Sequence, residues 1–537
     1  MLLPYATIFV TGAATLAMEL LASRVMTPYF GVSLYIWTGI LSITLVALAL
    51  GYWWGGRLAT RYAASGRFDR LRATFLLMPP LSALSLIAVC LVYPYVFPKL
   101  AAMDLVSGAF IACLLMLGVP LVTTSAMNPL LIAIRLQAKT RGDRTADAGA
   151  GGVFFTSTVG SVAGVVVTAF WLIPTFSNFV ALLVVALSLA LLPLASLTAQ
   201  AQPVSGRRTL ATVTALAVAA SAGLLWQAEN YLGRMWPARH SGVSWSIEAS
   251  VSSLFGTVKV LKSEPIDDRG LFVRVYFQDG LIQNRMYSDG RSYSFYTYAL
   301  EALSMMYQPQ ARSALILGLG AGVVPKHLAA RGIKVTAVEI DPASFEVAKR
   351  FFGLDDRKVD GVQADARTYL RQCVGKYDVV VVDLFHGDGT PDYLVTRDFF
   401  ADLRRCLTPG GVAVFNTFAD LELPLAYAHF LTTLRAEFGH VLLHRDDDRE
   451  ARQVNSFVVA SGESLRASPM RLDGVPSVYA DELEQLYTNA RQLDKSLTAG
   501  GQIVTDARSA AATDLARVQM AYRREVVKNL PPAFLVN

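Results

Sequence analysis

The hydrophobic positions divide the chain into two halves. Residues 1–226 contain repeated apolar runs with few charges, each long enough to cross the hydrocarbon core of a bilayer as a helix. The pattern predicts seven crossings, at 5–23, 34–55, 73–95, 105–134, 152–173, 178–198 and 209–226. The fourth run is too long for one straight crossing, and Pro120 and Pro129 are expected to break it, so an eighth crossing stays open. The first half is therefore expected to be an integral membrane domain.

From residue 227 onwards the pattern is that of a soluble protein. Residues 227–242 are expected to form a linker, and 243–290 a small antiparallel β unit, because short alternating runs are separated by turn residues. In 291–537, strand-like runs alternate with helical segments, and a helical extension follows. Such alternation predicts a mostly parallel, doubly wound sheet of Rossmann type, which binds ligands at the carboxyl ends of its strands.

The distribution of basic residues indicates the orientation of the chain in the membrane rather than its binding partners. The net charge of +6 does not predict nucleic-acid binding, because arginines and lysines gather beside the membrane segments. Seven crossings place all three basic clusters in the cytoplasm and the soluble half on the other side, whereas eight crossings allow a cytoplasmic soluble half. An intracellular nucleoside cofactor favours the cytoplasm, so we expect an inner-membrane protein whose soluble half faces that side. The clusters are Arg57, Arg61, Arg67, Arg70 and Arg72; Arg135, Lys139, Arg141 and Arg144; and Arg207 and Arg208.

The cysteines, the glycines and the ionisable residues of the membrane half allow fewer predictions. The four cysteines show no paired spacing, so neither a disulfide framework nor a metal site is predicted. The pairs Gly51/Gly55 and Gly160/Gly164 suit close helix packing. For Glu19, inside the first crossing, a substrate contact and a structural ion pair are both open, as they are for Arg24 at its end.

The most informative stretch runs from Ala314 to Asp341. An apolar run enters the turn Gly318-Leu319-Gly320-Ala321-Gly322; a helical segment and a β-branched run follow, and Glu339 comes 21 residues after the first glycine. Glycines allow a sharp turn and close approach to a ligand, while an acid ending the second strand can accept both ribose hydroxyls. Gly318, Gly320, Gly322 and Glu339 therefore predict a nucleoside-binding site.

Two further acids follow predicted strands. Asp365 ends the run 361–364, and Asp383 ends the run 377–382. Both are expected at the same edge of the sheet as the glycine turn. Asp383 is a candidate general base or substrate anchor, with a loop-capping role as the alternative. His386 is a candidate general base because its ordinary pKa suits proton transfer near neutral pH, and a surface role is equally open. Asp388, in the same loop, is a candidate substrate ligand or a turn residue.

These motifs resemble the spermidine synthase (polyamine aminopropyltransferase) family, and in particular bacterial proteins that fuse a multi-span membrane half to a spermidine-synthase-like domain. The resemblance covers about residues 245–440. It extends to the pattern GAATLAMELLASRVMTPYFG in the membrane half and to a terminal TDD-type segment at 501–506. It implies a class I methyltransferase-like α/β domain preceded by a small β unit.

The resemblance assigns roles residue by residue. Asp279-Gly280 with Gln283 matches the LDGxxQ element, whose glutamine lies near the cofactor. Tyr293 falls on the tyrosine of the DExxY stretch and is a substrate-binding candidate. Asp365-Ala366 matches the pair beside the adenine, which makes Asp365 and Ala366 cofactor-binding candidates. Asp383 falls on the acid that helps to deprotonate the attacking amine.

Several family positions differ. The aspartate of the GGGDG turn, which holds the aminopropyl amine, is Ala321 here, and the second acid of the DxxD pair is His386. Gly290 replaces the acid before Tyr293, Ser294-Phe295 replaces the amide-and-acid step after it, and Phe255-Gly256 replaces the YQ step. Losing each ion-pair partner costs about 3–5 kcal/mol, so putrescine is an unlikely acceptor. Ala321 also removes a charge that would repel the carboxylate of S-adenosylmethionine.

The sequence therefore predicts a membrane-anchored transferase that uses S-adenosylmethionine or decarboxylated S-adenosylmethionine, with methylthioadenosine as product and no metal. The expected acceptor is a small-molecule or amphipathic amine; the lipid bilayer is a partner, nucleic acid is not, and a homo-oligomer stays open. Methyl transfer and aminocarboxypropyl transfer or elimination are alternatives. A transporter or sensor with a nucleoside-binding soluble half is another, motivated by Glu19 and the predicted break in the fourth crossing.

Overall fold

The computed structural model describes residues 2–32, 34–138, 146–198, 205–385, 389–445, 452–468, 475–509 and 511–537. The chain forms two compact units. The first comprises Met1–Ala238 and Arg524–Asn537, and the second comprises Arg239–Arg523.

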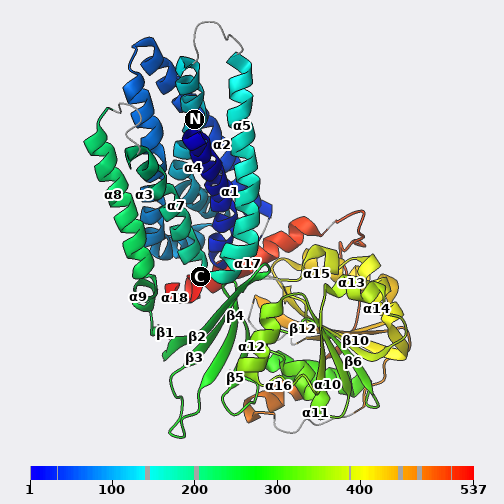
Figure 1. The fold of residues 1–537 in the computed structure, drawn as a ribbon. Helices are drawn as coiled ribbons and strands as arrows, with labels where there is room; N and C mark the ends of the chain where they lie inside the picture. The colour runs from blue at the N-terminus through cyan, green and yellow to red at the C-terminus, as the bar shows by residue number, and fades with distance from the viewer. Residues whose placement is uncertain are drawn as a thin grey trace. The chain divides into compact units, whose positions relative to one another are not determined.

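The first unit is a bundle of long helices (Figure 1). In the described part of the chain, seven helices are long and apolar enough to cross a membrane, which confirms the seven predicted apolar segments. Two further short helices, α9 and α18, belong to the same unit, and α9 falls in the segment expected as a linker. The helices are α1 (Leu2–Phe30), α2 (Leu34–Ala64), α3 (Phe68–Met103), α4 (Leu105–Ala138), α5 (Ala146–Val167) continued by η1 (Thr168–Leu172) and α6 (Ile173–Thr175), α7 (Asn178–Thr198), α8 (Arg207–Trp226), α9 (Ala228–Gly233) and α18 (Pro532–Leu535).

The break predicted in the fourth crossing is wrong. α4 runs as one helix from Leu105 to Ala138 with Pro120 and Pro129 inside it. Hydroxyl groups support the backbone around the first proline: Thr123 Oγ1 donates to the carbonyl of Pro120 at 2.8 Å, and Ser82 Oγ from α3 donates to the same carbonyl at 3.3 Å. α4 is therefore one continuous helix.

Glycines set the closest helix contacts of the bundle. A Cβ added to Gly160 or Gly164 of α5 would lie 2.1 Å from the carbonyl oxygen of Phe9 or 2.2 Å from that of Ala13, both on α1. A Cβ on Gly55 of α2 would lie 2.4 Å from the Ala126 carbonyl oxygen of α4. The backbones touch at these points, as small-xxx-small spacing predicts.

The second unit begins with a small antiparallel sheet in the order β1-β2-β3-β4-β5. It confirms the predicted β unit, and β1 lies in the segment expected as a linker. Its strands are β1 (Ala238–His240), β2 (Val243–Ser253), β3 (Gly256–Ser263), β4 (Val273–Gln278) and β5 (Leu281–Tyr287).

The core of the second unit is a larger sheet in the order β13-β11-β12-β10-β9-β6-β7-β8 (Figure 1). Strands β8, β7, β6, β9 and β10 are parallel, and β12, β11 and β13 add antiparallel pairs at one side. This confirms the doubly wound α/β prediction. The strands are β6 (Ser313–Leu317), β7 (Lys334–Glu339), β8 (Val359–Gln363), β9 (Tyr377–Val382), β10 (Leu407–Asp420), β11 (His440–Arg445), β12 (Gln453–Ser461) and β13 (Ala490–Gln492).

Helices cover both faces of this sheet because alternate residues of its buried strands point to opposite sides. Leu315 and Leu317 of β6 join the apolar cluster under α13, α14 and α15, whereas Ala314 and Ile316 join the cluster under α10, α11 and α16. The helices of this unit are α10 (Phe295–Tyr307), α11 (Val323–Ala330), α12 (Pro342–Phe352), α13 (Ala366–Arg371), η2 (Asp392–Leu394), α14 (Arg397–Cys406), α15 (Pro424–Glu437), α16 (Ser477–Thr488) and α17 (Ala512–Asn529), the last of which continues into the first unit.

A disulfide joins Cys373 to Cys406, so the expectation that the cysteines are unpaired is wrong for this pair. The two residues are 33 positions apart, and their Cα atoms lie 4.9 Å from each other. Cys373 follows α13 and Cys406 ends α14, and both are buried in one apolar cluster. Packing of the two helices brings the sulfurs together, which spacing along the sequence does not reveal.

Candidate active site

The glycine turn connects β6 to α11 at the carboxyl edge of the large sheet. Gly318, Gly320 and Gly322 all have positive φ, at 91°, 51° and 73°. A Cβ on Gly318 would lie 2.1 Å from the carbonyl oxygen of Asp383, so a side chain there would clash with the end of β9. At Gly320, an added Cβ would meet no atom of the described chain within 4 Å. The turn thus leaves backbone open to a ligand at Gly320, as a nucleoside cradle requires.

Glu339 ends β7, the neighbouring strand, and is held in place by backbone amides. Its Oε2 accepts from the Leu319 N–H of the glycine turn at 3.0 Å, and its Oε1 accepts from the Asp341 N–H at 2.9 Å. Burial raises the pKa of Glu339, and the nearby Asp341 acts in the same direction, while the two amides lower it. Each oxygen keeps a second lone pair, so this fixed carboxylate can still accept two hydroxyl donors.

Asp383 follows β9 directly, and the structure pairs it with an amide from the next strand. Asn416 Nδ2 in β10 donates to Asp383 Oδ1 at 2.8 Å. Burial raises the pKa of Asp383 to about 6; the Asn416 hydrogen bond lowers it, and the charge of Glu339 raises it. A carboxylate with a pKa close to neutral is suited to accept a proton from a substrate.

Asn416 was missed by the sequence analysis, although the rule that found Asp383 applies to it. It follows Phe415 in β10, whose partner in β9 is Val382, the residue before Asp383. A polar residue at the carboxyl end of a buried parallel strand was the available signal.

Tyr296, the second residue of α10, is also near Asp383. Burial and the negative charge of Asp383 hold the pKa of Tyr296 well above its ordinary value. Its hydroxyl donates to the carbonyl of Gln283 at 3.2 Å and accepts from Asn284 Nδ2 at 2.8 Å. Tyr296 is therefore bound to β5, which carries the predicted Gln283, and lies close enough to Asp383 to feel its charge.

Tyr293 has different surroundings from those of Tyr296. Its ring packs 5.0 Å from the ring of Tyr287, and its carbonyl accepts from the hydroxyl of Tyr479 at 2.7 Å. Through Tyr287 and Tyr479, Tyr293 contacts both β5 and α16. Among the described residues, these contacts do not link it with the carboxylates at the glycine turn.

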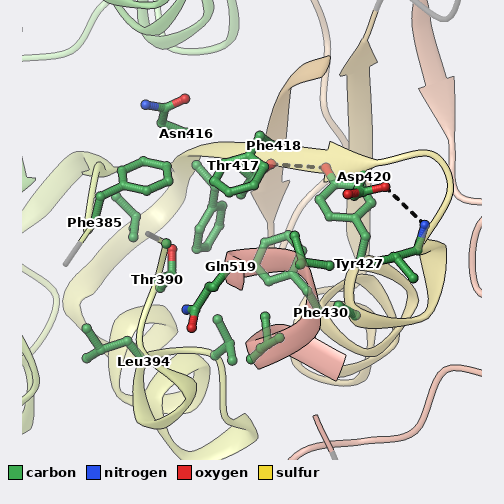
Figure 2. A pocket seen from close by; sticks show the side chains of 18 residues that line it. Phe385, Thr390, Leu394, Asn416, Thr417, Phe418, Asp420, Tyr427, Phe430 and Gln519 are labelled. Atoms are coloured by element: carbon green, nitrogen blue, oxygen red, sulfur yellow. Dashed lines mark hydrogen bonds between the residues drawn. The ribbon is translucent and has the colours of Figure 1, made fainter. Parts of the chain in front are cut away.

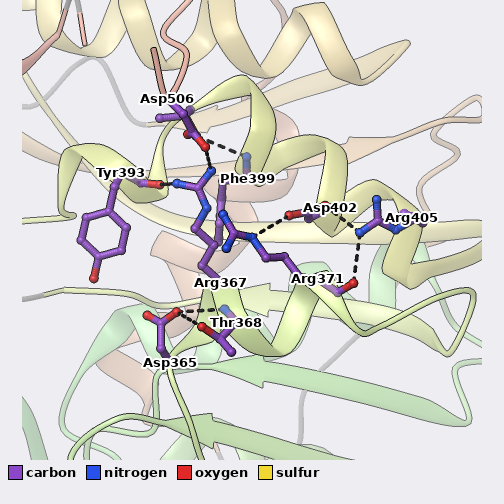
Figure 3. Close-up of polar contacts among 10 residues, drawn as sticks. Asp365, Arg367, Thr368, Arg371, Tyr393, Phe399, Asp402, Arg405 and Asp506 are labelled. Carbon is purple, nitrogen blue, oxygen red and sulfur yellow. Dashed lines mark hydrogen bonds and ion pairs between the residues drawn. The ribbon is translucent and has the colours of Figure 1, made fainter. Parts of the chain in front are cut away.

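Asp365 and Ala366 lie at the end of β8, where α13 begins. Asp365 caps this helix: its Oδ1 accepts from the Thr368 N–H at 2.8 Å and from Thr368 Oγ1 at 3.0 Å (Figure 3). Ala366 is buried in the core beneath. The cap leaves Asp365 Oδ2 without a role in the helix, so one carboxylate oxygen remains for a ligand group.

Ala321 points into the protein. It is 1% exposed and belongs to the apolar cluster formed with Val258, Val260 and Tyr276 of the small sheet. Asp279, from the LDGxxQ match, serves the same sheet, because its Oδ1 accepts from the Thr257 N–H at 3.0 Å. Ala321 provides no carboxylate for the ammonium group of an aminopropyl chain.

A pocket lies beside Asn416, at the ends of β9 and β10 (Figure 2). Its walls are largely apolar and include five aromatic side chains, and Figure 2 shows Thr390 and Gln519 near one another in the wall. The rings of Phe385 and Phe418 are stacked, with their centroids 6.1 Å apart. Tyr427 stacks on Phe430 at 5.7 Å.

The acidic residue among the described lining side chains is Asp420, and its charge is already compensated. Its carboxylate accepts from Arg452 Nε at 3.0 Å and from the amide N–H groups of Glu422 and Leu423 at 3.0 and 3.1 Å. It also accepts from Gln453 Nε2 at 3.2 Å. Its side chain is fully buried, so the described pocket wall offers no available carboxylate.

A second polar cluster fixes the segment that follows the pocket (Figure 3). Arg367 of α13 forms an ion pair with Asp506 and donates to the carbonyl of Tyr393 at 2.9 Å. Asp506 also accepts from Thr396 Oγ1, the cap of α14, at 2.8 Å. The arginine guanidinium lowers the pKa of Asp506. Asp506 and Arg367 thus hold Tyr393 and Thr396, just before α14, in place.

Two candidates, His386 and Asp388, lie outside the described residues. In the described part of the chain, no group of three or more histidine, cysteine, aspartate and glutamate side chains is placed to hold a metal ion.

Residues 293–441 match the family model of the spermine/spermidine synthase domain. The chain carries a spermidine synthase domain. This confirms the resemblance drawn from the glycine turn and the strand-end acids, and it identifies a spermidine-synthase-like transferase. The match includes the glycine turn, Glu339, Asp365 and Asp383.

Curated relatives extend the comparison. A polyamine aminopropyltransferase of Vibrio vulnificus is 28% identical over 211 residues, covering 38% of this chain and 69% of the relative. One from Mycobacterium tuberculosis is 26% identical over 424 residues, covering 74% of this chain and 78% of the relative. A match of that length extends beyond the spermidine synthase domain into the membrane half. The N-terminal histidine N-methyltransferase of Emericella nidulans is 32% identical over 139 residues, covering 25% of each chain.

Proposed function

We propose that the spermidine synthase domain transfers a carbon chain from an S-adenosyl sulfonium donor to an amine, with methylthioadenosine as product. The observation that carries this proposal is the pair of strand-end carboxylates at the glycine turn: Glu339, fixed by two amides, and Asp383, held by Asn416 with a pKa of about 6. The Glu339 carboxylate is suited to accept the hydroxyls of a ribose, and the Asp383 carboxylate is suited to accept a proton from the attacking amine.

In this proposal Glu339 accepts the ribose hydroxyls, and the open backbone at Gly320 lets the donor lie against the turn. Asp365 offers its second oxygen to the adenine, and Gln283 contributes from β5. Asp383 accepts the proton of the attacking amine, and Asn416 keeps its carboxylate oriented. The carbon next to a sulfonium is already electrophilic, so aligning the amine and removing its proton suffices.

Methyl transfer from S-adenosylmethionine is the second candidate. It is favoured by Ala321, which replaces the acid that would hold an aminopropyl amine, and by the likeness to a fungal N-methyltransferase. The two reactions leave different nucleosides, since methyl transfer releases S-adenosylhomocysteine. Transfer of the aminocarboxypropyl chain would release methylthioadenosine from the full donor.

The test uses full-length protein in detergent with each donor separately and a panel of amines, and identifies nucleoside products by mass spectrometry. Glu339→Gln should weaken methylthioadenosine binding by about 10–100-fold, because a charge-assisted hydrogen bond is worth about 1.5–3 kcal/mol. Asp383→Asn should bind methylthioadenosine normally and lose turnover. Unimpaired turnover in Asp383→Asn, or no nucleoside binding by the unsubstituted protein, would overturn the proposal.

A further inference from the structure

A fully buried arginine of the C-terminal helix α17 contacts the small sheet. Arg523 is the last residue of the second unit, and among the described residues it is the largest side chain that is fully buried. Its Nη1 donates to the carbonyl oxygen of Asp279 at 2.7 Å, although the two residues are 244 positions apart in the chain. Burying a guanidinium costs free energy because the charge loses its hydration, and an apolar side chain would pack there without that cost. The arginine therefore indicates a requirement at the turn that it contacts.

The contacted carbonyl lies in the two-residue turn between β4 and β5. Asp279 and Gly280 have φ of 47° and 89°, and positive values at both central residues are typical of a type I′ hairpin turn. Such a turn sets the register of the two strands that it joins. The contacts that hold the turn therefore also fix the positions of the residues that follow it in β5.

The side chain of Asp279 belongs to a buried group of charges. Asp279 is 8% exposed and Lys259 of β3 is 4% exposed. Burial lowers the pKa of Lys259 to about 7, and the charge of Asp279 acts in the opposite direction. The Asp279 carboxylate thus provides a counter-charge for Lys259, while the main-chain carbonyl of Asp279 accepts from Arg523. The turn is held both by β3 and by α17.

β5 contains a bulge shortly after this turn. Ile282 pairs with Phe277 of β4, and Asn284 pairs with the residue before Phe277, so Gln283 is the extra residue of the bulge. A bulge changes the direction in which a side chain points, and bulges are common next to active sites. Gln283 is the candidate donor-binding residue of β5, and its carbonyl accepts from the hydroxyl of Tyr296 at 3.2 Å. The direction of the Gln283 side chain therefore depends on how the β4–β5 hairpin is held at its turn.

We propose, on the basis of the function proposed above, that Arg523 is a positioning residue for the donor site: it fixes the β4–β5 turn so that the bulge presents Gln283 to the nucleoside. Arg523 is buried and acts on the donor only through the turn. The same helix lines the pocket at the ends of β9 and β10 with Leu515, Val518 and Gln519. α17 therefore contributes to both the donor-side hairpin and the pocket.

A purely structural anchor would have the same contacts, but its loss would have a different effect. If Arg523 only stabilises the fold, its replacement lowers the free energy of unfolding and leaves nucleoside affinity unchanged in the molecules that remain folded. If Arg523 positions Gln283, the folded molecules also bind the nucleoside more weakly. The two roles are therefore separated by measuring affinity and stability on the same preparations.

The experiment measures methylthioadenosine affinity and thermal unfolding of the full-length protein in detergent. Arg523→Met keeps a long side chain but removes the donor to Asp279. We expect the affinity of folded Arg523→Met to fall by about 3–10-fold, the size of one neutral hydrogen bond to the nucleoside. Arg523→Lys keeps the charge and a donor and should recover most of the affinity. The matched control is Arg524→Met, because exposed Arg524 donates instead to the carbonyl of Met103 in the first unit at 2.7 Å; its affinity should be unchanged.

A double-mutant cycle identifies the route of the effect. Gln283→Ala should lower methylthioadenosine affinity by about 3–10-fold as well, because it removes the same hydrogen bond. If Arg523 acts through Gln283, adding Arg523→Met to Gln283→Ala should cause no further loss. Additive losses would contradict positioning through Gln283.

The outcomes distinguish this inference from the function on which it rests. Equal affinity in folded Arg523→Met and the unsubstituted protein would overturn the inference alone. No nucleoside binding by the unsubstituted protein would overturn the proposed function and the inference with it. If Arg523→Met does not fold, Gly280→Ala strains the same turn at φ 89° and should weaken binding in the same way, with no further loss in Gln283→Ala. Unchanged affinity in Gly280→Ala would then overturn the inference.

Discussion

Replacing Asp383 by asparagine should remove turnover and at the same time stabilise the protein. The pKa of Asp383 rises from 3.8 to about 6 in the folded chain, mainly through burial. Above pH 6 Asp383 is ionised in both states, but its ionisation costs more free energy in the folded state. The buried carboxylate therefore lowers the free energy of unfolding at these pH values. A shift of about two units corresponds to about 3 kcal/mol, because each unit is 1.36 kcal/mol.

Asparagine has nearly the same shape and carries no charge, so most of this cost should disappear. We expect Asp383→Asn to raise the free energy of unfolding at pH 8 by about 2–3 kcal/mol. The gain should shrink as the pH falls through 6 and vanish below about 3.8, where both states are protonated. Stabilisation with loss of activity is typical of residues kept for function.

The assay is thermal or denaturant unfolding of the detergent-solubilised chain at pH 8 and pH 4, with nucleoside release measured on the same preparations. Asp360→Asn, at an exposed position of β8, is the matched control and should change neither quantity. A loss of stability in Asp383→Asn at pH 8 would refute the reasoning, because it would mean that the ionised carboxylate stabilises the fold.

Three further predictions follow from the same geometry. Asn416→Ala removes the hydrogen bond that favours ionised Asp383, so the acid limb of the pH–rate profile should move up by about 1–2 units; an unchanged limb would contradict this. Gly318→Ala should prevent folding or nucleoside binding, whereas Gly332→Ala, with φ 82° and open space, should cost only about 1 kcal/mol, measured by thermal unfolding and methylthioadenosine titration. Asp506→Asn should lower the free energy of unfolding by about 1–2 kcal/mol because it removes the carboxylate paired with the buried Arg367 guanidinium. If the variant and the unsubstituted protein were equally stable at both low and high salt, this prediction would be wrong.

The fold, and the position of the glycine turn and strand-end acids at one edge of the sheet, could be predicted because both depend on local patterns. Apolar length identifies a membrane crossing, and a glycine turn followed by Glu339 identifies a strand–turn–helix–strand unit. Asp383 was found because it directly follows a buried strand. Their positions in the chain were enough to place these residues at one edge of the sheet.

What the sequence missed depends on contacts between distant segments. Tyr293 precedes α10 and Tyr296 is its second residue, and only the packing shows that Tyr296 lies near Asp383. Cys373 and Cys406 meet because α13 and α14 pack together. The prolines of α4 were expected to break it, but the helix continues through both.

The groups proposed to bind the donor and the residues of the pocket wall are completed at different times during synthesis. The groups proposed to hold the donor and the base are all present once Asn416 has been made, whereas the pocket wall also needs Leu515, Val518 and Gln519 of α17. About 100 residues separate these points, or about 5–20 s at ordinary elongation rates. A nascent or C-terminally truncated chain would therefore have an incomplete pocket wall.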